Sequence, residues 1–595
     1  MPKEDSLHLN VYTFVALINA CAKLKDLEQG LCLHAEVDKF GWINRDLFIG
    51  SSLVYMYAKC GSLDKAQNVF DTLDSRDVVS WNSLITGYVG QGQGEEALQC
   101  FEKMQVAGVF PNAITYSCVL KACGNIGATE KGREVHAEVE RRGFLEKDIV
   151  LATAIVDMYA KCGFVSRAQE MFDKLVVRDV ISWNSLIAGY ATHGNGEEAL
   201  KCFEHMQLEG VSPNSVTFIC SLKACGSTGE IGKGEAIHNE IKRKALLEKD
   251  IPLGTSLIGM YAQCGMLEKA QETFGELPVR NIVSWNTLIS GFITHGCGEE
   301  ALKFFHQMQF EGASPNSVTY ICALKACTSI GAIDEGQKIH AEIDRKGFLH
   351  TDIAVGTSLV DMYVKFGLLT KAQDVFDSLA IQNVVSWNSL ITGYVEHKLG
   401  EQALQCFEKM QGEGITPDIV TYVCALRACG SIGAIEKGIS IHIEAGRRGL
   451  LERDLNISSA LVDMYGKCGL FDQAQEVFHK LPVRDLIAWN SLICAHTEHG
   501  HGEEALELFE RMKLEGVKPD SQTFICSLKA CGSIRATDKG RKIHQEIERE
   551  GLLEEDIVLG TALVDMYTKC GLLAKAKNVF EMLPARSVSL WNALI

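Results

Sequence analysis

Six asparagines at one fixed spacing are the most regular polar residues of the chain. Each directly follows a tryptophan, and each lies 102 residues from the next. An asparagine amide carries a hydrogen-bond acceptor and two N–H donors, so its chemistry is recognition through hydrogen bonds. Two roles are open: the amide ties neighbouring helices or caps a helix start, or it contacts a ligand. The six are Asn82, Asn184, Asn286, Asn388, Asn490 and Asn592.

A second regular pattern, His-x-Glu, matches half of a zinc deaminase signature. The other half, Pro-Cys-x-x-Cys, occurs nowhere in the chain, so we expect no zinc site. The sequence also offers no phosphate-binding loop, nucleophile triad or paired carboxylates. We therefore predict a protein that is not an enzyme and has no cofactor or metal. The His-x-Glu copies begin at His34, His136, His238, His340, His442 and His544.

The 22 cysteines are also regular, and most of them fall on the same 102-residue grid. Three series begin at Cys21, Cys60 and Cys118, and no Cys-x-x-Cys pair occurs. This pattern favours free cysteines that act as small core residues rather than a disulfide or metal framework. Such usage is typical of a reducing compartment.

These residues must be positioned by a repeated structure, and each 102-residue period divides into three helical hairpins. In one period the hairpins are Val78–Asn112, Ala113–Asp148 and Ile149–Asp179, with lengths of 35, 36 and 31 residues. Within the first hairpin, apolar residues from Trp81 to Tyr88 recur at helical spacing. A glycine-rich turn then leads to a second amphipathic helix, and the other two hairpins follow the same scheme.

A hairpin of this size cannot bury its apolar face alone, so neighbouring hairpins must stack to form the core. The sequence predicts an all-α fold, an α-solenoid superhelix of helix-turn-helix hairpins with no independent second domain. We expect 17 complete hairpins and about 34 helices. The predicted parts are a partial repeat at 1–10, two hairpins at 11–77, five 102-residue triplets at 78–587 and a truncated repeat at 588–595.

The formal net charge of −18 limits the possible partners. Non-specific nucleic-acid binding needs a basic surface, so any nucleic-acid function must rest on local contacts, and we expect no DNA partner. No long apolar stretch free of charges occurs, so we expect no membrane-spanning helix. The first residues, MPKEDSLHLN, show neither a secretion signal nor a transit peptide.

The hairpin pattern resembles a known family over essentially the whole chain. Hairpins of 35, 36 and 31 residues, with VSWNSLI, EEAL and a final PN in the first, are similar to plant organellar pentatricopeptide repeat proteins of the P-L-S subclass. Tetratricopeptide repeats share the second-helix pattern but keep a constant length of about 34 residues. The resemblance implies sequence-specific binding of single-stranded RNA in mitochondria or chloroplasts, usually to direct C-to-U editing.

Two further expectations concern partners. Editing members of this family usually carry C-terminal extension motifs and a deaminase domain, which this sequence does not show, so a deaminase-bearing protein would act in trans. The alternative is a protein-interaction scaffold of tetratricopeptide type, which the negative charge favours. Variation between Asn and Asp at one position of near-identical repeats argues against that scaffold.

The resemblance makes the fifth and the terminal residue of a hairpin the two side chains that read one base. We call them a reading pair. In the 35-residue hairpins the reading pairs are Asn82 and Asn112, Asn184 and Asn214, Asn286 and Asn316, Asn388 and Asp418, and Asn490 and Asp520. In the 31-residue hairpins they are Ser51 and Asp77, Thr153 and Asp179, Thr255 and Asn281, Thr357 and Asn383, and Ser459 and Asp485. A sixth such pair, Thr561 and Ser587, departs from the pattern and is assigned no base.

The chemistry of the terminal residue suits base recognition. Aspartate accepts a hydrogen bond from the N–H on the Watson–Crick edge of G or U, whereas asparagine donates one to the ring acceptor of A or C. The resemblance also implies that Thr or Ser at the fifth position favours a purine and Asn a pyrimidine. From Ser51 onward, with the N-terminus at the 5′ end, the predicted target is G-Y-n-G-Y-n-A-Y-n-A-U-n-G-U, where Y favours C.

Neighbouring residues complete the predicted site. The second residue of each 35-residue hairpin is apolar and is expected to stack on a base; these are Val79, Ile181, Val283, Val385 and Ile487. The 36-residue hairpins are expected to read weakly, because their fifth residues are Val15, Ser117, Ile219, Ile321, Val423 and Ile525. Two basic series either meet phosphates or form a solvated face. They are Lys121, Lys223, Lys325, Arg427 and Lys529, and Lys59, Lys161, Lys365, Lys467 and Lys569.

Overall fold

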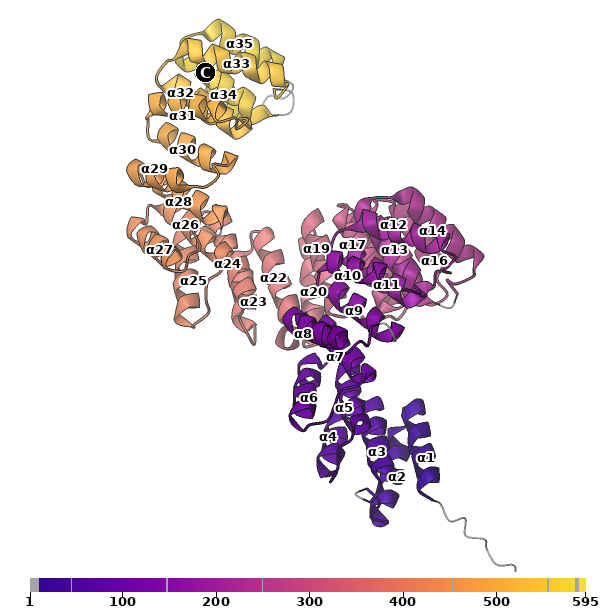
Figure 1. The fold of residues 1–595 in the computed structure, drawn as a ribbon. Helices are drawn as coiled ribbons and strands as arrows, with labels where there is room; N and C mark the ends of the chain where they lie inside the picture. The colour runs from indigo at the N-terminus through magenta and orange to yellow at the C-terminus, as the bar shows by residue number, and fades with distance from the viewer. Residues whose placement is uncertain are drawn as a thin grey trace, which may run out of the picture. The chain divides into compact units, whose positions relative to one another are not determined.

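The protein, seen in a computed structural model, consists of α-helices joined by short turns (Figure 1). The structure describes residues 10–43, 45–145, 148–248, 250–451, 454–553, 556–583 and 588–594. These residues form 36 helices and no β-strand, which confirms the predicted all-α solenoid class. Ser587 and residues 1–9 of the partial repeat lie outside them. Among the described helices, none combines the length and the hydropathy that a bilayer crossing requires.

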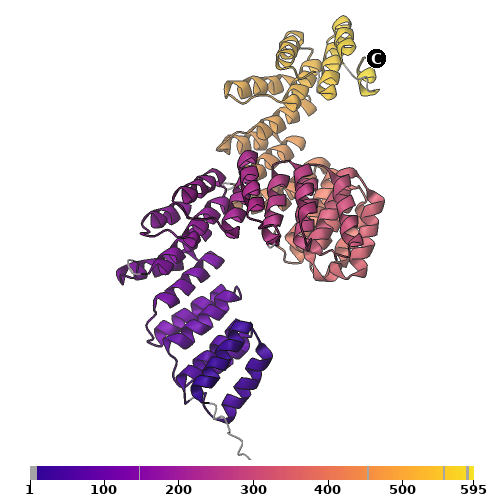
Figure 2. The same ribbon diagram turned by 90° about the vertical axis from the view of Figure 1, so that its right-hand side faces the viewer.

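The chain divides into two compact units, Met1–His295 with Glu311–Ala313, and Gly296–Phe310 with Ser314–Ile595. Within each unit the hairpins follow one another in chain order, as the colours of Figure 2 show. The first unit contains α1 (Val11–Leu24), α2 (Leu27–Lys39), α3 (Leu47–Lys59), α4 (Leu63–Thr72), α5 (Val78–Gly90), α6 (Gly94–Val106), α7 (Ala113–Ile126), α8 (Thr129–Arg141), α9 (Ile149–Lys161), α10 (Val165–Asp173), α11 (Val180–Thr192), α12 (Gly196–Leu208), α13 (Ser215–Thr228), α14 (Ile231–Arg243), α15 (Ile251–Gln263), α16 (Leu267–Glu276) and α17 (Ile282–Thr294). The second contains α18 (Gly298–Phe310), α19 (Ser317–Ile330), α20 (Ile333–Arg345), α21 (Phe348–Thr351), α22 (Ile353–Lys365), α23 (Leu369–Ser378), α24 (Val384–Glu396), α25 (Gly400–Gly412), α26 (Ile419–Ile432), α27 (Ile435–Arg447), α28 (Leu455–Lys467), α29 (Phe471–Lys480), α30 (Leu486–Glu498), α31 (Gly502–Leu514), α32 (Ser521–Ser533), α33 (Thr537–Glu550), α34 (Ile557–Lys569), α35 (Leu573–Met582) and α36 (Val588–Leu594).

The two helices of a hairpin begin in different ways. Helix α7 starts after Asn112, whose Oδ1 accepts the backbone N–H of Thr115 at 3.0 Å. Helix α6 has no side-chain cap, but Glu95 and Glu96 in its first turn interact favourably with the helix dipole. Gly127 ends α7 with a φ of 70°, a left-handed conformation that glycine adopts without strain. The first helix of a hairpin is therefore anchored by a side chain at its start.

The recurring tryptophans join one hairpin to the next. Trp81 of α5 is 3% exposed, and its ring meets Phe70 of α4 edge-on, with ring centroids 4.6 Å apart. The next copy, Trp183 with Phe172, has the same geometry at 4.5 Å. Such an aromatic pair adds about 0.5–1.5 kcal/mol beyond its area burial. The tryptophan holds the junction between a 31-residue hairpin and the following 35-residue hairpin.

The histidines of the His-x-Glu pattern also join hairpins. Nδ1 of His136 on α8 lies 2.9 Å from the hydroxyl of Tyr159 on α9. Burial lowers the pKa of His136, which favours the neutral imidazole. The other five histidines make the same contact at 2.7–2.8 Å. The described residues contain no cluster of His, Cys, Asp or Glu that could hold a metal ion.

The expectation that the cysteines are free is wrong for one pair. Cys494 and Cys526 form a disulfide between α30 and α32, while the other 20 cysteines are free. A second sulfur, at position 494, makes this bond possible. The corresponding residue is threonine in the first and fourth triplets, where the hydroxyl of Thr86 or Thr392 lies 3.2–3.3 Å from the cysteine of the 36-residue hairpin, and it is Ala188 and Ser290 in the second and third. In the core, burial raises the pKa of Cys123 to about 12, so this thiol is unreactive.

Candidate nucleic-acid interface

Every terminal residue of a reading pair is the N-cap of the next first helix. Asn112 shows the arrangement: its Oδ1 accepts the Thr115 backbone N–H, and its own backbone N–H donates to Thr115 Oγ1 at 3.1 Å. The N-cap is therefore the terminal residue and not the asparagine after tryptophan, for which capping was one of two open roles. The caps are Asp77, Asn112, Asp179, Asn214, Asn281, Asn316, Asn383, Asp418, Asp485 and Asp520.

The asparagine after tryptophan ties two hairpins together. Nδ2 of Asn82 donates to Oδ1 of Asn112 at 3.1 Å, and Oδ1 of Asn82 accepts from Thr115 Oγ1 at 2.7 Å. With Asn82 only 8% exposed, both of its polar groups are engaged. The hydrogen bond from the fifth to the terminal side chain recurs at 2.9–3.1 Å in three further reading pairs, namely Asn184 and Asn214, Asn388 and Asp418, and Asn490 and Asp520. Asn286 is equally buried, and Asn316 caps α19.

This network leaves one polar atom of the terminal side chain available. Oδ1 of Asn112 already accepts from Thr115 and Asn82, and a backbone N–H can only donate, so this atom is the amide oxygen. Within the described residues Nδ2 of Asn112 has no partner, and in Asp418 the same place is taken by Oδ2. The exchange of Asn for Asp therefore replaces a donor with an acceptor and preserves the cap.

The charge state of the terminal aspartates supports this exchange. Burial alone would raise the pKa of Asp418, but hydrogen bonds from Thr421 and Asn388 outweigh it and hold the pKa below its ordinary value. Asp520 has a lowered pKa for the same reasons, with Thr523 and Asn490 as its hydrogen-bond partners. Both groups are carboxylates at neutral pH and accept hydrogen bonds.

The reading pairs of the 31-residue hairpins are joined differently. Only Ser51 donates to its terminal partner, with its Oγ 3.3 Å from Oδ1 of Asp77. The hydroxyls of Thr255 and Thr357 donate to backbone carbonyls one turn earlier, at 3.0 and 2.9 Å. The buried hydroxyls of Thr153 and Ser459 have no partner among the described residues. Here the structure does not bring most fifth and terminal side chains into contact.

An exposed apolar row runs beside the reading pairs. The second residues of the 35-residue hairpins, such as Val79 and Ile181, are 53–62% exposed. They lie three positions before the fifth residue and therefore on the same helical face. The row also continues in the other hairpins, where it was not predicted: Ile114 is 60% exposed and Val150 is 72% exposed. The signal was available, because the same second position is apolar in nearly every hairpin.

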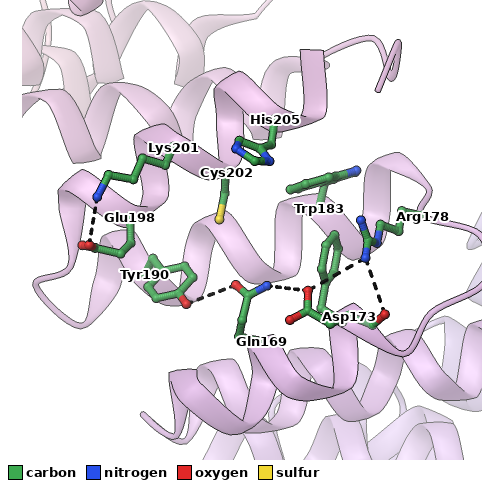
Figure 3. Close-up of a pocket in the computed structure, with 10 residues that line it drawn as sticks. Gln169, Asp173, Arg178, Trp183, Tyr190, Glu198, Lys201, Cys202 and His205 are labelled. Atoms are coloured by element: carbon green, nitrogen blue, oxygen red, sulfur yellow. Dashed lines mark hydrogen bonds and ion pairs between the residues drawn. The ribbon is translucent and has the colours of Figure 1, made fainter. Parts of the chain in front are cut away.

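Figure 3 shows a pocket of about 260 Å³ between α10, α11 and α12. Its polar groups bind one another: the Tyr190 hydroxyl donates to Gln169 at 3.1 Å, and Gln169 donates to Asp173 at 2.8 Å. Burial raises the pKa of the Cys202 thiol to about 11. These groups offer neither an activated nucleophile nor a free acid–base pair, so the pocket indicates no catalytic chemistry.

Comparison with known proteins identifies the repeat. One sequence model, described as the PPR repeat family, matches residues 76–125, 178–227, 280–329, 382–431 and 484–533. A second, described as PPR repeat, matches 12–42, 51–78, 114–144, 150–180, 255–282, 357–380, 457–486 and 561–588. The fold is similar to the crystal structure of the maize pentatricopeptide repeat protein PPR10, with a TM-score of 0.57, 19% identity and coverage of 98% of this chain and 90% of that one.

Relatives from Arabidopsis thaliana extend the comparison to nearly the full chain. Pentatricopeptide repeat-containing protein At5g27110 is 32% identical over 96% of this chain and 83% of its own length. At3g53360, mitochondrial, is 32% identical over 100% of this chain and 77% of its own length. At3g63370, chloroplastic, is 32% identical over 98% and 60%. With its capped and tied hairpins, the chain belongs to the pentatricopeptide repeat family of plant proteins.

Proposed function

We propose that this protein binds single-stranded RNA sequence-specifically, with one base at each reading pair, and recognises the target in organellar RNA processing. The observation that carries the proposal is the polar atom that the network leaves available on two terminal side chains, a donor on Asn112 and an acceptor on Asp418. A side-chain donor suits the ring acceptor on the Watson–Crick edge of A or C, and a side-chain acceptor suits the N–H on that edge of G or U. The capping network holds that atom in place before RNA binds.

The energies are sufficient for a specific site on an acidic protein. By analogy with duplex recognition, a correctly paired base edge discriminates by about 1–3 kcal/mol. Stacking of bases on aromatic side chains contributes about 1–3 kcal/mol each, and the aliphatic row beginning at Val79 would contribute less. Ten reading pairs can therefore bind tightly without a basic surface.

Relatives support the cellular setting. PPR10 has also been solved in complex with an 18-nucleotide psaJ RNA element, with a TM-score of 0.51 to this chain and 19% identity. The relatives At3g53360 and At3g63370 carry mitochondrial and chloroplastic designations. We assign this chain to one of those organelles and to the P-L-S subclass, with five triplets from 78 to 587. Its role would be target recognition for C-to-U editing, with the deaminase supplied by another protein.

A protein-interaction scaffold is the second candidate, and the net charge of −18 favours it. The two functions differ in what they require of the terminal residues. A peptide groove gains nothing from exchanging Asn for Asp at a capped helix start, whereas base recognition depends on it. A binding assay on a variant in which only one terminal residue is changed between Asn and Asp therefore distinguishes the two candidate functions.

The test is the substitution Asp418→Asn, which keeps the N-cap and replaces the free acceptor with a donor. The assay measures binding to the 14-nucleotide predicted target with U or C at its eleventh base. The wild-type protein should prefer U and the variant C, with about a tenfold or larger reversal for each. Asp148→Asn is the matched control, because Asp148 caps α9 but ends a 36-residue hairpin. An unchanged preference in Asp418→Asn, or no RNA binding by the wild-type protein, would overturn the proposal.

A further inference from the structure

The two basic series on the first helices have opposite surroundings. One series is the ninth residue of the five 36-residue hairpins that follow the first, in which Asn19 takes this place, and the other is the thirteenth residue of most 31-residue hairpins. Members of both series are exposed. They differ in whether a carboxylate neutralises them, and this difference decides which series can meet a phosphate.

In four of the five 31-residue hairpins that carry this lysine, it is paired with an aspartate one turn earlier on the same helix; Lys59 is the exception, with its Nζ 5.6 Å from the ring centroid of Tyr55. Lys161 Nζ lies 2.7 Å from an oxygen of Asp157, and the pair is repeated in three later hairpins. Each aspartate is four residues before its lysine, a spacing that places both on one helical face. The later pairs are Lys365 with Asp361 at 2.9 Å, Lys467 with Asp463 at 2.8 Å, and Lys569 with Asp565 at 2.7 Å.

In the 36-residue hairpins the basic residues have no such partner. Among the described residues, no carboxylate lies within ion-pair distance of Lys121, Lys223 or Lys325. Lys223 Nζ instead lies 3.4 Å from the hydroxyl of Thr192, so it extends toward α11 of the preceding hairpin. Among the described residues these three lysines carry no ion pair, unlike the four lysines that are paired with aspartate.

Helix geometry places these lysines beside the proposed path of the RNA. Lys121 is seven residues after the exposed Ile114 and four after the fifth residue, Ser117. Residues seven apart on an α-helix share a face, and four residues correspond to about 6 Å along the axis. The lysine is therefore about one turn from the level of the fifth residue and on the same face as the exposed apolar row.

We propose that the 36-residue hairpins, which are expected to read bases only weakly, hold the RNA backbone through phosphate contacts with Lys121, Lys223 and Lys325. The inference rests on the proposed RNA binding and adds a division of labour to it. In these hairpins the fifth residue is mostly Val or Ile, as in Ile219 and Ile321, so the ninth residue supplies the contact instead. One phosphate would be held every three bases.

The last two triplets should contribute less. The residue that corresponds to Thr192 is Glu396 in the fourth triplet and Glu498 in the fifth. Glu396 acts electrostatically on Cys424, one turn before Arg427 on α26. A nearby carboxylate lowers the attraction of Arg427 and Lys529 for a phosphate.

The test is the triple substitution Lys121→Gln, Lys223→Gln and Lys325→Gln, with binding to the predicted 14-nucleotide RNA and its scramble measured from low to moderate salt. Each lost phosphate contact on a single strand should reduce the slope of log affinity against log salt by about 0.7, so the triple variant should lose about 2. Affinity should fall by the same factor for both RNAs, because phosphates carry no sequence information.

The matched control is Asp157→Asn with Lys161→Gln, which removes one neutralised pair and leaves the net charge unchanged. This control should keep the wild-type salt slope. An unchanged slope in the triple variant, or an equal loss in the control, would overturn the inference. If the wild-type protein itself bound no RNA, the proposed function would fail instead. If the wild-type protein binds the target more tightly than the scramble, a failure of the phosphate inference can be told apart from a failure of the proposed function.

Discussion

The 35-residue and the 31-residue hairpins use the same two positions in different ways. In the first kind, Asn184 is locked to its terminal partner Asn214 and to Thr217, so both of its polar groups are occupied. In the second kind, the Thr153 hydroxyl is buried without a partner. Within the described residues, the fifth residue is thus a structural tie in 35-residue hairpins, but in two of the 31-residue hairpins it is an unsatisfied group. On the proposed function, the base contact in 35-residue hairpins therefore falls on the terminal residue.

The largest effect that separates the two hairpins is expected from Asn184→Ala. The substitution removes the hydrogen bond that Asn184 donates to Asn214 and the one that it accepts from Thr217, both in a buried site, which costs about 1–3 kcal/mol in unfolding free energy. Chemical denaturation of the full chain measures this cost, and hydrogen exchange in α11 and α13 locates it. If protection from hydrogen exchange were lost only in helices far from α11 and α13, the result would contradict the hydrogen-bond link between these two helices.

The next effect concerns the cap. Asp418→Ala removes the N-cap of α26 and should cost about 0.5–2 kcal/mol, whereas Asp418→Asn should change stability by only a few tenths. The denaturation midpoints of the two variants give the comparison. Equal destabilisation by both would mean that the carboxylate charge, and not the cap geometry, is the stabilising element.

Acid should weaken the aspartate caps before the asparagine caps. The pKa of Asp418 is lowered from 3.8 by folding, so the group stabilises the protein fully above that value and the contribution is lost as pH falls through the lower folded pKa. Hydrogen exchange below about pH 4 should show added opening of α26 and α32. Helices α7 and α13, capped by Asn112 and Asn214, are the internal reference. Equal opening in all four would contradict the assignment.

The smallest effect is expected from Thr153→Ala. Because its buried hydroxyl has no partner, removing that hydroxyl abolishes no hydrogen bond and relieves a desolvation penalty. We expect a stability change near zero or slightly positive, read from the denaturation midpoint. The affinity of the variant for RNA with the predicted G at the fourth base should nevertheless fall. A loss of stability as large as that of Asn184→Ala would remove the contrast between the two hairpins.

Much of this could be predicted from the sequence, because repeats reveal spacing. The helices, the junction at Trp81 and the stacked all-α fold follow from the 102-residue period. The sequence Asn112-x-x-Thr115 even contains a capping signature. What spacing cannot show is which polar atom of the Asn112 side chain is already occupied, because that depends on Asn82, thirty residues earlier. The Cys494–Cys526 bond was also missed, because it requires two helices to be placed side by side.

On the proposed function, ten hairpins each read one base, whereas the 36-residue hairpins between them contribute little to base recognition. The most direct measurement is the affinity of the wild-type protein for the 14-nucleotide target and for every single-base substitution of it. Substitutions at the ten read positions should cost roughly 5- to 150-fold, from about 1–3 kcal/mol each. Substitutions at the four unread positions should stay within about twofold. A profile with equal losses at read and unread positions would contradict the account.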